Sequence, residues 1–282
     1  MTRARTATVL SHSRPHEVTD ALRMLMQAAE REGVVLRFDA EETRKLCVDP
    51  REGIVVDAPL SDDVELCVVL GGDGTILRAL RRYAGTSVPV FAVNFGEIGF
   101  LATIEPADIE DGIRRALSGD FELLRLPAIV LESPQGTAVN DVAIHRKVGE
   151  RVAEIAYAVD GEVVGSVRCD GLVVATPAGS TGYNLANGGP VMAWGVEGLV
   201  VSFIAPHSLT ARALVVAPGD PLTIHNRARD PLDIAVDGRP AGEIPAGQTL
   251  DVRFVNELGT IAQLPGSSFY RRLREKFGRL AS

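Results

Sequence analysis

The sequence predicts an α/β domain with a parallel sheet, followed by an all-β domain, in a chain of 282 residues. Two observations support this division. Short apolar runs without alternation are separated by helical segments in the first part of the chain, which is typical of buried parallel strands. Further on, strand-like runs follow one another closely, as in antiparallel sheets. The change comes near Arg125, so we expect domains over residues 1–124 and 125–261.

The first domain alternates strands and helices. Apolar residues between Val18 and Ala29 recur at helical spacing, and Pro15 stands near the start of that helix. Four strands are expected, over Thr6–Leu10, Val34–Phe38, Leu66–Leu70 and Val88–Val93. Because open parallel sheets bind ligands at the carboxyl ends of their strands, the turns after the third and fourth strands are the first candidates for a site.

The second domain is expected to contain many short strands. Asp160-Gly161 is a hairpin signal between two of them. The expected strands are Ala128–Glu132, Ala138–His145, Ile155–Val159, Glu162–Val167, Leu172–Ala175, Leu199–Ile204, Ala213–Val216, Leu222–His225, Asp233–Val236 and Thr249–Phe254. The stretch from Phe269 to Leu280 differs, because Phe269, Leu273, Phe277 and Leu280 share one face of a helix, which indicates a docked C-terminal helix.

The composition is that of an ordinary soluble globular protein, with 46% hydrophobic and 23% charged residues. The formal net charge of -8 argues against a nucleic-acid-binding surface, which needs a basic face. Neither a signal peptide nor a membrane span is apparent. Cys47, Cys67 and Cys169 lack metal-type spacing and fit a reducing compartment. We therefore expect a cytoplasmic protein without nucleic-acid or membrane partners.

The most informative motif is Gly71-Gly72-Asp73-Gly74-Thr75, which follows the third strand and precedes a helix. Glycines allow a sharp turn and a close approach to a ligand, and a helix N-terminus offers N–H groups that suit phosphate. A carboxylate in such a loop would repel phosphate unless it holds a metal or takes a proton from an attacking hydroxyl. Both are tasks of a kinase, whereas the alternative interpretation is a plain turn.

Three further segments have the residues of a nucleotide site. Asn94 to Leu101 forms a second glycine-containing turn, after the fourth strand. Asn140-Asp141 offers donors and acceptors that can grip the vicinal hydroxyls of a ribose, although such a pair is also a common turn. The third segment is rich in glycine and hydroxyl residues, and it comprises Arg168 to Gly171, Thr176 to Asn184 and Gly188 to Pro190.

Together with Pro206-His207-Ser208-Leu209 and Asp237-Gly238, these motifs occur in an order that resembles the NAD kinase family in its bacterial form, over nearly the whole chain. The resemblance implies Mg-dependent transfer of the γ-phosphoryl group of ATP to the 2′-hydroxyl of the adenosine ribose of NAD, giving NADP and ADP. It implies a Rossmann-like α/β first domain, similar to that of diacylglycerol kinases and phosphofructokinases, to which a helix in residues 262–282 returns. A homodimer or homotetramer is implied as well.

The resemblance also implies roles for individual residues. Asp73 corresponds to the catalytic aspartate, while Mg²⁺, or another divalent cation, enters on ATP without a direct protein ligand. The implied NAD-binding residues are Asp73, Gly74, Arg78, Asn140, Asp141, Arg151, Arg168, Asp170, Ala178, Thr181, Gly182, Tyr183, Asn184 and Ala186. The implied ATP- or phosphate-binding residues are Gly71, Gly72, Gly74, Thr75, Asn94 and Gly96. Departures from the common pattern are Asp141 for glutamate, Ala178 for threonine or serine, and Gly182 for alanine.

Two other function classes are alternatives. Lipid and sphingosine kinases share the Gly-Gly-Asp-Gly-Thr motif but usually have an Asn-Glu pair directly after it, where this chain has Ile76-Leu77-Arg78. A non-catalytic dinucleotide-binding sensor is the second alternative, and the retained Asp73 argues against it. The sequence leaves open whether polyphosphate replaces ATP, whether NADH is accepted, and how the activity is regulated.

Overall fold

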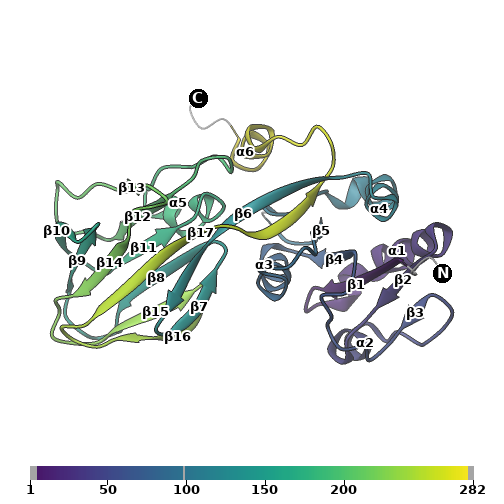
Figure 1. Cartoon of the computed structure of the whole chain (residues 1–282), viewed down its shortest axis with the longest axis horizontal. Coiled ribbons are helices and arrows are strands. Elements are labelled where there is room, and N and C mark those ends of the chain that lie inside the picture. The colour runs from purple at the N-terminus through teal and green to yellow at the C-terminus, as the bar shows by residue number, and fades with distance from the viewer. Residues whose placement is uncertain (1–4, 98, 279–282) are drawn as a thin grey trace. The chain divides into compact units, whose positions relative to one another are not determined.

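The computed structural model describes residues 5–97 and 99–278, and its chain divides into two compact units (Figure 1). Unit 1 comprises Met1–Arg125 and Gly259–Ser282, and unit 2 comprises Leu126–Leu258. The second unit is therefore an insertion in the chain of the first. The return to unit 1 begins at Gly259, inside a strand, whereas residue 262 is expected from the sequence.

Unit 1 contains the predicted parallel sheet, with its strands in the order β5-β4-β1-β2-β3. These strands are β1 (Arg5–Ser11), β2 (Val34–Arg37), β3 (Ile54–Val55), β4 (Leu66–Gly71) and β5 (Val90–Asn94). The helices are η1 (Pro15–Val18), α1 (Thr19–Glu32), α2 (Ala40–Leu46), α3 (Asp73–Arg82), η2 (Pro106–Asp108) and α4 (Ile109–Ser118). Every residue of β4 is buried, as its unbroken apolar run predicts. The α/β prediction for the N-terminal domain is confirmed.

Local signals explain how the helices of unit 1 begin and end. Apolar periodicity does not reveal α2, because Glu42 is its one buried residue. The helix starts instead at a cap, since the Asp39 carboxylate accepts the N–H of Glu42 at 2.8 Å. Helix α1 ends at Gly33, whose φ of 64° lies in the left-handed region that favours glycine.

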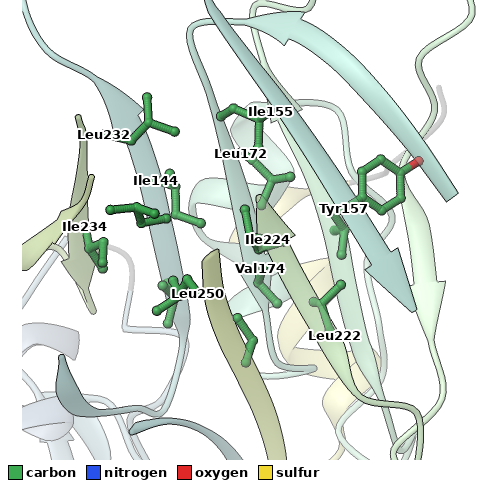
Figure 2. Close-up of a cluster of buried hydrophobic side chains, with 14 of the residues drawn as sticks. Ile144, Ile155, Tyr157, Leu172, Val174, Leu222, Ile224, Leu232, Ile234 and Leu250 are labelled. Carbon is green, nitrogen blue, oxygen red and sulfur yellow. The ribbon is translucent and has the colours of Figure 1, made fainter. Parts of the chain in front are cut away.

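Unit 2 consists of two antiparallel sheets whose buried side chains form one core (Figure 2). One sheet contains β10-β9-β14-β17, with β6 paired to β17 and β7 to β6, and the other is ordered β13-β12-β11-β8-β15-β16. Ile155 and Ile224 of the first sheet and Ile144 and Leu172 of the second belong to this core. The prediction of a C-terminal β domain is confirmed.

The bounds of the remaining elements follow the predicted pattern with a few differences. The strands are β6 (Glu122–Glu132), β7 (Gln135–Ala138), β8 (Asp141–Arg146), β9 (Ala153–Val159), β10 (Glu162–Cys169), β11 (Gly171–Ala175), β12 (Leu199–Ile204), β13 (Leu214–Val216), β14 (Leu222–Asn226), β15 (Leu232–Val236), β16 (Arg239–Ile244) and β17 (Thr249–Gln263), and the short helices are η3 (Gly179–Thr181) and α5 (Tyr183–Ala186). The single strand expected over 138–145 is interrupted at Val139-Asn140. Strand β16 escapes prediction because most of its residues are exposed.

The end of the chain belongs to unit 1. Ile261, near the end of β17, pairs in parallel with Val90 of β5. Helix α6 (Phe269–Phe277) follows, and the rings of Phe269 and Phe277 each lie 5.8 Å from that of Phe100, between centroids. The expected return of the last helix is confirmed, while Leu280 lies outside the described residues. Among the described helices, each is too short or too polar to cross a membrane.

Candidate active site

The Gly71–Thr75 motif forms the predicted turn from strand to helix in unit 1. Strand β4 ends at Gly71, Gly72 is the N-cap, and Asp73 is the first residue of α3. The Asp73 carboxylate accepts two backbone hydrogen bonds, from the N–H of Phe100 at 3.1 Å and from that of Leu101 at 3.0 Å. A carboxylate can accept about four hydrogen bonds, so Asp73 is held in one orientation and retains acceptor capacity for a ligand.

The glycines of this turn serve different purposes. A side chain at Gly72 would meet the Cα of Gly96 at 2.9 Å, so the two glycine turns of unit 1 touch backbone to backbone. A side chain at Gly71 would meet Thr75 Oγ1 at 2.7 Å. A side chain at Gly74 would meet no described atom within 4 Å, and this residue is exposed. Packing therefore requires Gly71 and Gly72, whereas Gly74 leaves open space beside Asp73.

Asn94 holds the second turn together. Its Nδ2 donates to the Glu105 carboxylate at 3.0 Å, and its Oδ1 accepts the N–H of Gly96 at 3.0 Å. A side chain at Gly99, where φ is 64°, would collide with Asn94 Nδ2 at 2.1 Å. Ile98, in the same segment, lies outside the described residues. The polar atoms of Asn94 thus shape the turn that supplies the N–H groups to Asp73.

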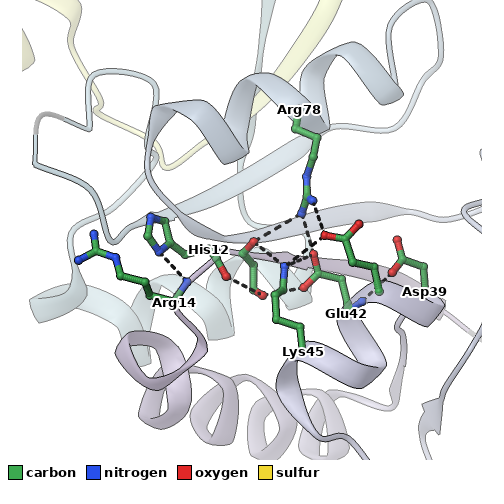
Figure 3. Close-up of polar contacts among 8 residues, drawn as sticks. His12, Arg14, Asp39, Glu42, Lys45 and Arg78 are labelled. Carbon is green, nitrogen blue, oxygen red and sulfur yellow. Dashed lines mark hydrogen bonds and ion pairs between the residues drawn. The ribbon is translucent and has the colours of Figure 1, made fainter. Parts of the chain in front are cut away.

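Arg78 joins a buried ion-pair network in unit 1 (Figure 3). Its guanidinium donates to the fully buried carboxylate of Glu42 at 2.7 Å, and Lys45 donates to the same oxygen at 2.8 Å. The hydroxyl of Ser11 donates to the other oxygen of Glu42 at 2.6 Å. A buried carboxylate needs such partners, so Arg78 has a structural task next to the glycine turn.

Asn140 and Asp141 lie at the start of β8 in unit 2, where Asp237 organises them. The Asp237 carboxylate accepts the N–H groups of Val139 at 3.2 Å, Asn140 at 2.8 Å and Asp141 at 3.2 Å. Asp237 occupies a turn with a left-handed φ of 45°, between β15 and β16. The break between β7 and β8 is therefore a defined structure that presents two polar side chains.

The environment of Asn140 and Asp141 is suited to a polar ligand. Burial, and then the negative charge of Asp237, raise the pKa of Asp141 to about 7. The side-chain oxygen of Asn140 is buried without a hydrogen-bond partner among the described residues. Buried polar atoms are almost always satisfied in native proteins, so this oxygen is a candidate acceptor for a ligand donor.

Polar side chains of the loop after β11 bond to backbone groups of the loop itself and of the break between β7 and β8. Thr176 Oγ1 donates to the Val139 carbonyl at 2.6 Å and accepts the N–H of Gly179 at 3.1 Å. The Asn184 amide donates to the Ser180 carbonyl at 2.9 Å and to the Pro190 carbonyl at 3.0 Å. Asn184 thus shapes the loop. Gly179 packs directly on the backbone of Asn140, because a Cβ atom added at Gly179 would lie 2.0 Å from the Asn140 carbonyl oxygen.

Other predicted NAD-binding residues lie on this loop. Tyr183 stacks on His145, with ring centroids 5.6 Å apart and planes inclined by 21°. Ala178 is buried, Gly182 and Ala186 are exposed, and the Thr181 hydroxyl donates to the Ala178 carbonyl at 3.1 Å. The unburied backbone of Gly182 lies close to Asp141, since an added side chain would stand 3.9 Å from its Oδ2.

Asp170 has an unexpected partner. Its carboxylate pairs with Arg146, at 2.6 Å, which keeps the pKa of Asp170 below its usual range. Within the part of the chain described, Asp170 therefore pairs with Arg146 and not with Arg168, its neighbour two positions away in the sequence. Arg168 and Arg151 are both exposed, and neither has a side-chain hydrogen bond or ion pair to another described residue. Their side chains are available to a ligand.

The sequence does not predict the contacts of three residues near the predicted site. Asp237 is visible only as part of an Asp-Gly turn, and Arg146 only as one more arginine after a strand. Arg272, on α6, donates to the carbonyls of Phe100 and Ala102. Since the partners of these residues are distant in the chain, local patterns carry no signal for the contacts.

The described residues, 5–97 and 99–278, contain no group of three or more His, Cys, Asp or Glu side chains placed to hold a metal ion.

Each of the two units matches a family model, and the two models describe the two domains of one protein family. Residues 3–121 match the family model described as ATP-NAD kinase N-terminal domain, and residues 139–258 match that described as ATP-NAD kinase C-terminal domain. The chain is 37% identical over 238 residues to an NAD kinase of Gemmatimonas aurantiaca, covering 80% of each chain. It is 34% identical over 287 aligned positions to NAD kinase 2 of Streptomyces avermitilis, covering 98% of this chain and 95% of that one.

The fold also has a close counterpart among solved structures. Yeast NADH kinase complexed with NADH superposes with a TM-score of 0.84 at 21% sequence identity, covering 100% of this chain and 90% of that one. At this level of identity the likeness concerns the fold.

Proposed function

The chain belongs to the NAD kinase family, and we propose that it transfers the γ-phosphoryl group of ATP to the 2′-hydroxyl of the adenosine ribose of NAD, giving NADP and ADP. The observation that carries this proposal is the Asp73 carboxylate, which two backbone N–H groups hold in place. Beside it, a side chain added at Gly74 would meet no described atom within 4 Å. Such a carboxylate can orient an alcohol and accept its proton.

Asp73 acts as the general base of the reaction. A ribose hydroxyl is a weak nucleophile, so its alignment with the phosphoryl group matters more than the removal of its proton. The hydrogen bonds from Phe100 and Leu101 restrict the carboxylate to one plane. The open space at Gly74 lets the acceptor approach that carboxylate without a steric barrier.

Asn140 and Asp141 hold the acceptor nucleotide in unit 2. The unpartnered oxygen of Asn140 accepts a donor of NAD, and Asp141 accepts ribose hydroxyls when it is ionised. The loop that contains Thr181, Tyr183 and Asn184 supplies the walls of this subsite. Arg78, Arg151, Arg168, Asp170, Ala178, Gly182 and Ala186 complete the proposed NAD-binding set.

The donor enters as the magnesium complex of ATP. Mg²⁺ on the triphosphate supplies positive charge that neutralises the transferring phosphoryl group. The backbone N–H groups at the start of α3 and the turn at Gly96 form the proposed phosphate contacts, together with Gly71, Gly72, Thr75 and Asn94. Gly71, Gly72 and Asn94 also maintain the turns, so substitutions there affect both shape and binding.

The wider setting is also part of the proposal. We infer a cytoplasmic enzyme of NADP biosynthesis that forms homodimers or homotetramers. NAD kinase models match both units, which favours this function over that of a lipid kinase. Polyphosphate as donor and NADH as acceptor are two variations of the same chemistry.

One assay tests the function. The purified chain is incubated with NAD, ATP and MgCl₂, and NADP is measured with an NADP-specific dehydrogenase. We expect NADP in equal amounts to ADP, and none when either nucleotide is omitted. Tight NAD binding without turnover would instead identify a dinucleotide sensor, and replacing ATP with polyphosphate in the same assay determines the donor.

A further inference from the structure

Helix α6 reaches the carboxylate of Asp73 through a single turn of unit 1. Arg272, 172 residues beyond Phe100 in the chain, donates through Nη1 to the Phe100 carbonyl at 2.8 Å and also to the Ala102 carbonyl. The same turn donates the N–H groups of Phe100 and Leu101 to Asp73. The carbonyl groups of this turn therefore accept hydrogen bonds from the Arg272 guanidinium, while its N–H groups donate to the catalytic carboxylate of Asp73.

Arg272 is held in a fixed place by its surroundings. Burial lowers the pKa of its guanidinium, and the carboxylates of Asp73 and Glu105 oppose this effect. An arginine keeps its charge under such conditions, so it must keep its hydrogen-bond acceptors as well. The two carbonyls of the turn are such acceptors, so a shift of the turn would disturb the hydrogen bonds of the partly buried guanidinium.

Two more contacts join α6 to the turns of the site. The ring of Phe100 contacts the rings of both Phe269 and Phe277, with centroid distances of 5.8 Å in each case. Lys276 pairs with Glu105, which in turn accepts the Asn94 amide at 3.0 Å. The helix thus fixes both ends of the segment from Asn94 to Glu105 within unit 1.

We propose that Arg272 is a positioning residue of the phosphoryl-transfer reaction, which holds the turn at residues 99–102 so that its N–H groups orient the Asp73 carboxylate toward the acceptor hydroxyl. This inference rests on the proposed function. It makes the last helix part of the catalytic apparatus, because an error of about 1 Å in the position of a reacting group can reduce turnover by about 100-fold.

The first test is kinetic. Arg272→Ala is expected to lower kcat by about 10- to 100-fold while the KM for NAD changes less than about twofold. Arg274→Ala is the matched control, since Arg274 is an exposed arginine of the same helix. Because one nitrogen of Arg272 makes both hydrogen bonds, Arg272→Lys is expected to recover part of the lost kcat.

A double-mutant cycle separates positioning from a general loss of stability. In an Asp73→Asn background, Arg272→Ala is expected to have little further effect on kcat, because the group that it positions is already lost. A multiplicative loss in that background would overturn the proposal. Equal losses of kcat in Arg272→Ala and Arg274→Ala would overturn the proposal as well.

Hydrogen exchange gives a readout that needs no activity. Exchange at the amides of Phe100 and Leu101 is expected to become faster in Arg272→Ala and in Arg272→Lys, and to stay unchanged in Arg274→Ala. Unchanged protection in both Arg272 variants would refute the positioning role. If the unmodified chain forms no NADP while these exchange effects appear, the proposed function fails and the structural coupling of α6 to Asp73 stands.

Discussion

The carboxylate of Asp237 accepts the backbone N–H of Asp141 at 3.2 Å, which brings two acidic residues together at the start of β8. Burial and this neighbouring charge raise the pKa of Asp141 to about 7. The arrangement is costly for the fold when Asp141 is ionised. The neighbouring Asn140 oxygen has no hydrogen-bond partner among the described residues, and the two features together support the proposed role of Asp141 in binding the acceptor.

The first prediction concerns Asp141→Asn. The folded-state pKa lies above the unfolded value of about 3.9, so the folded protein binds the extra proton and wild-type stability falls as pH rises from about 4 to about 7. The Asp141→Asn variant has no carboxylate at this position, so its stability does not fall with pH in this way. At pH 8 its free energy of unfolding should exceed that of the wild type by on the order of 2–4 kcal/mol, and the excess should shrink at pH 5.

The same variant should bind NAD more weakly, by roughly 1.5–3 kcal/mol at pH 8, because a charged acceptor is lost. Denaturant unfolding at pH 5 and 8 and calorimetric titration with NAD check the two effects. Asp220→Asn, at an exposed position of the same unit, is the control and should change neither quantity. A variant that is less stable than the wild type at pH 8 would contradict the raised pKa.

The second prediction concerns Gly74→Ala. A helical glycine costs about 0.5–1 kcal/mol relative to alanine, and the added methyl group meets no described atom within 4 Å. Stability should therefore stay the same or rise, while kcat/KM for NAD falls at least about tenfold. Melting temperatures and steady-state kinetics are the measurements.

Gly72→Ala provides the contrast, since its methyl group would meet the Cα of Gly96 at 2.9 Å and should destabilise the protein. Full activity in Gly74→Ala would show that the open space beside Asp73 is not used by a substrate.

The third prediction concerns Arg168, which has no side-chain hydrogen bond or ion pair to another described residue. Its guanidinium is proposed to favour the 2′-phosphorylated nucleotide, because an arginine fork matches phosphate geometry. Arg168→Ala should weaken NADP binding clearly more than NAD binding in calorimetric titrations. Arg146→Ala breaks the ion pair with Asp170 at 2.6 Å and should weaken both ligands alike. Equal losses of NAD and NADP affinity in Arg168→Ala would contradict the proposed contact of Arg168 with the 2′-phosphate.

The fourth prediction concerns Arg78, whose guanidinium lies 2.7 Å from the fully buried Glu42. Arg78→Ala leaves that carboxylate with Lys45 and Ser11, so the free energy of unfolding should fall by about 1–3 kcal/mol. Arg114→Ala, which removes an exposed ion pair with Asp111, should cost at most about 1 kcal/mol.

The kinetics of Arg78→Ala then decide its place in the proposed NAD-binding set. A purely structural role leaves the KM for NAD within about twofold of the wild type in the folded protein. A larger rise in KM at constant ATP affinity would show that Arg78 also contacts NAD.

Local chemistry explains which parts of the fold and site could be predicted. The strand, turn and helix around Asp73 follow from an apolar run and adjacent glycines, which act within a few residues. The polar helix α2 could not be found in that way, because a cap at Asp39 and a buried Glu42 stabilise it in place of an apolar face.

Contacts that close long loops are the second class that sequence patterns miss. Asp237 is 97 residues from Asn140, and Arg272 is 172 residues from Phe100. Each acts on backbone groups, which every residue has, so no pair of complementary side chains marks the contact in the sequence. Asp237 and Arg272 hold backbone groups that are distant in the chain, so their contacts required the structure.

The turnover number of Asp73→Asn in the NADP-forming assay tests the proposed mechanism most sharply. The substitution keeps the size of the side chain and removes the base, so kcat should fall by roughly two to four orders of magnitude, the usual scale for a general base. NAD affinity, measured by calorimetry on the same samples, should change little. A variant that forms NADP at close to the wild-type rate would contradict the assignment of Asp73 as the base.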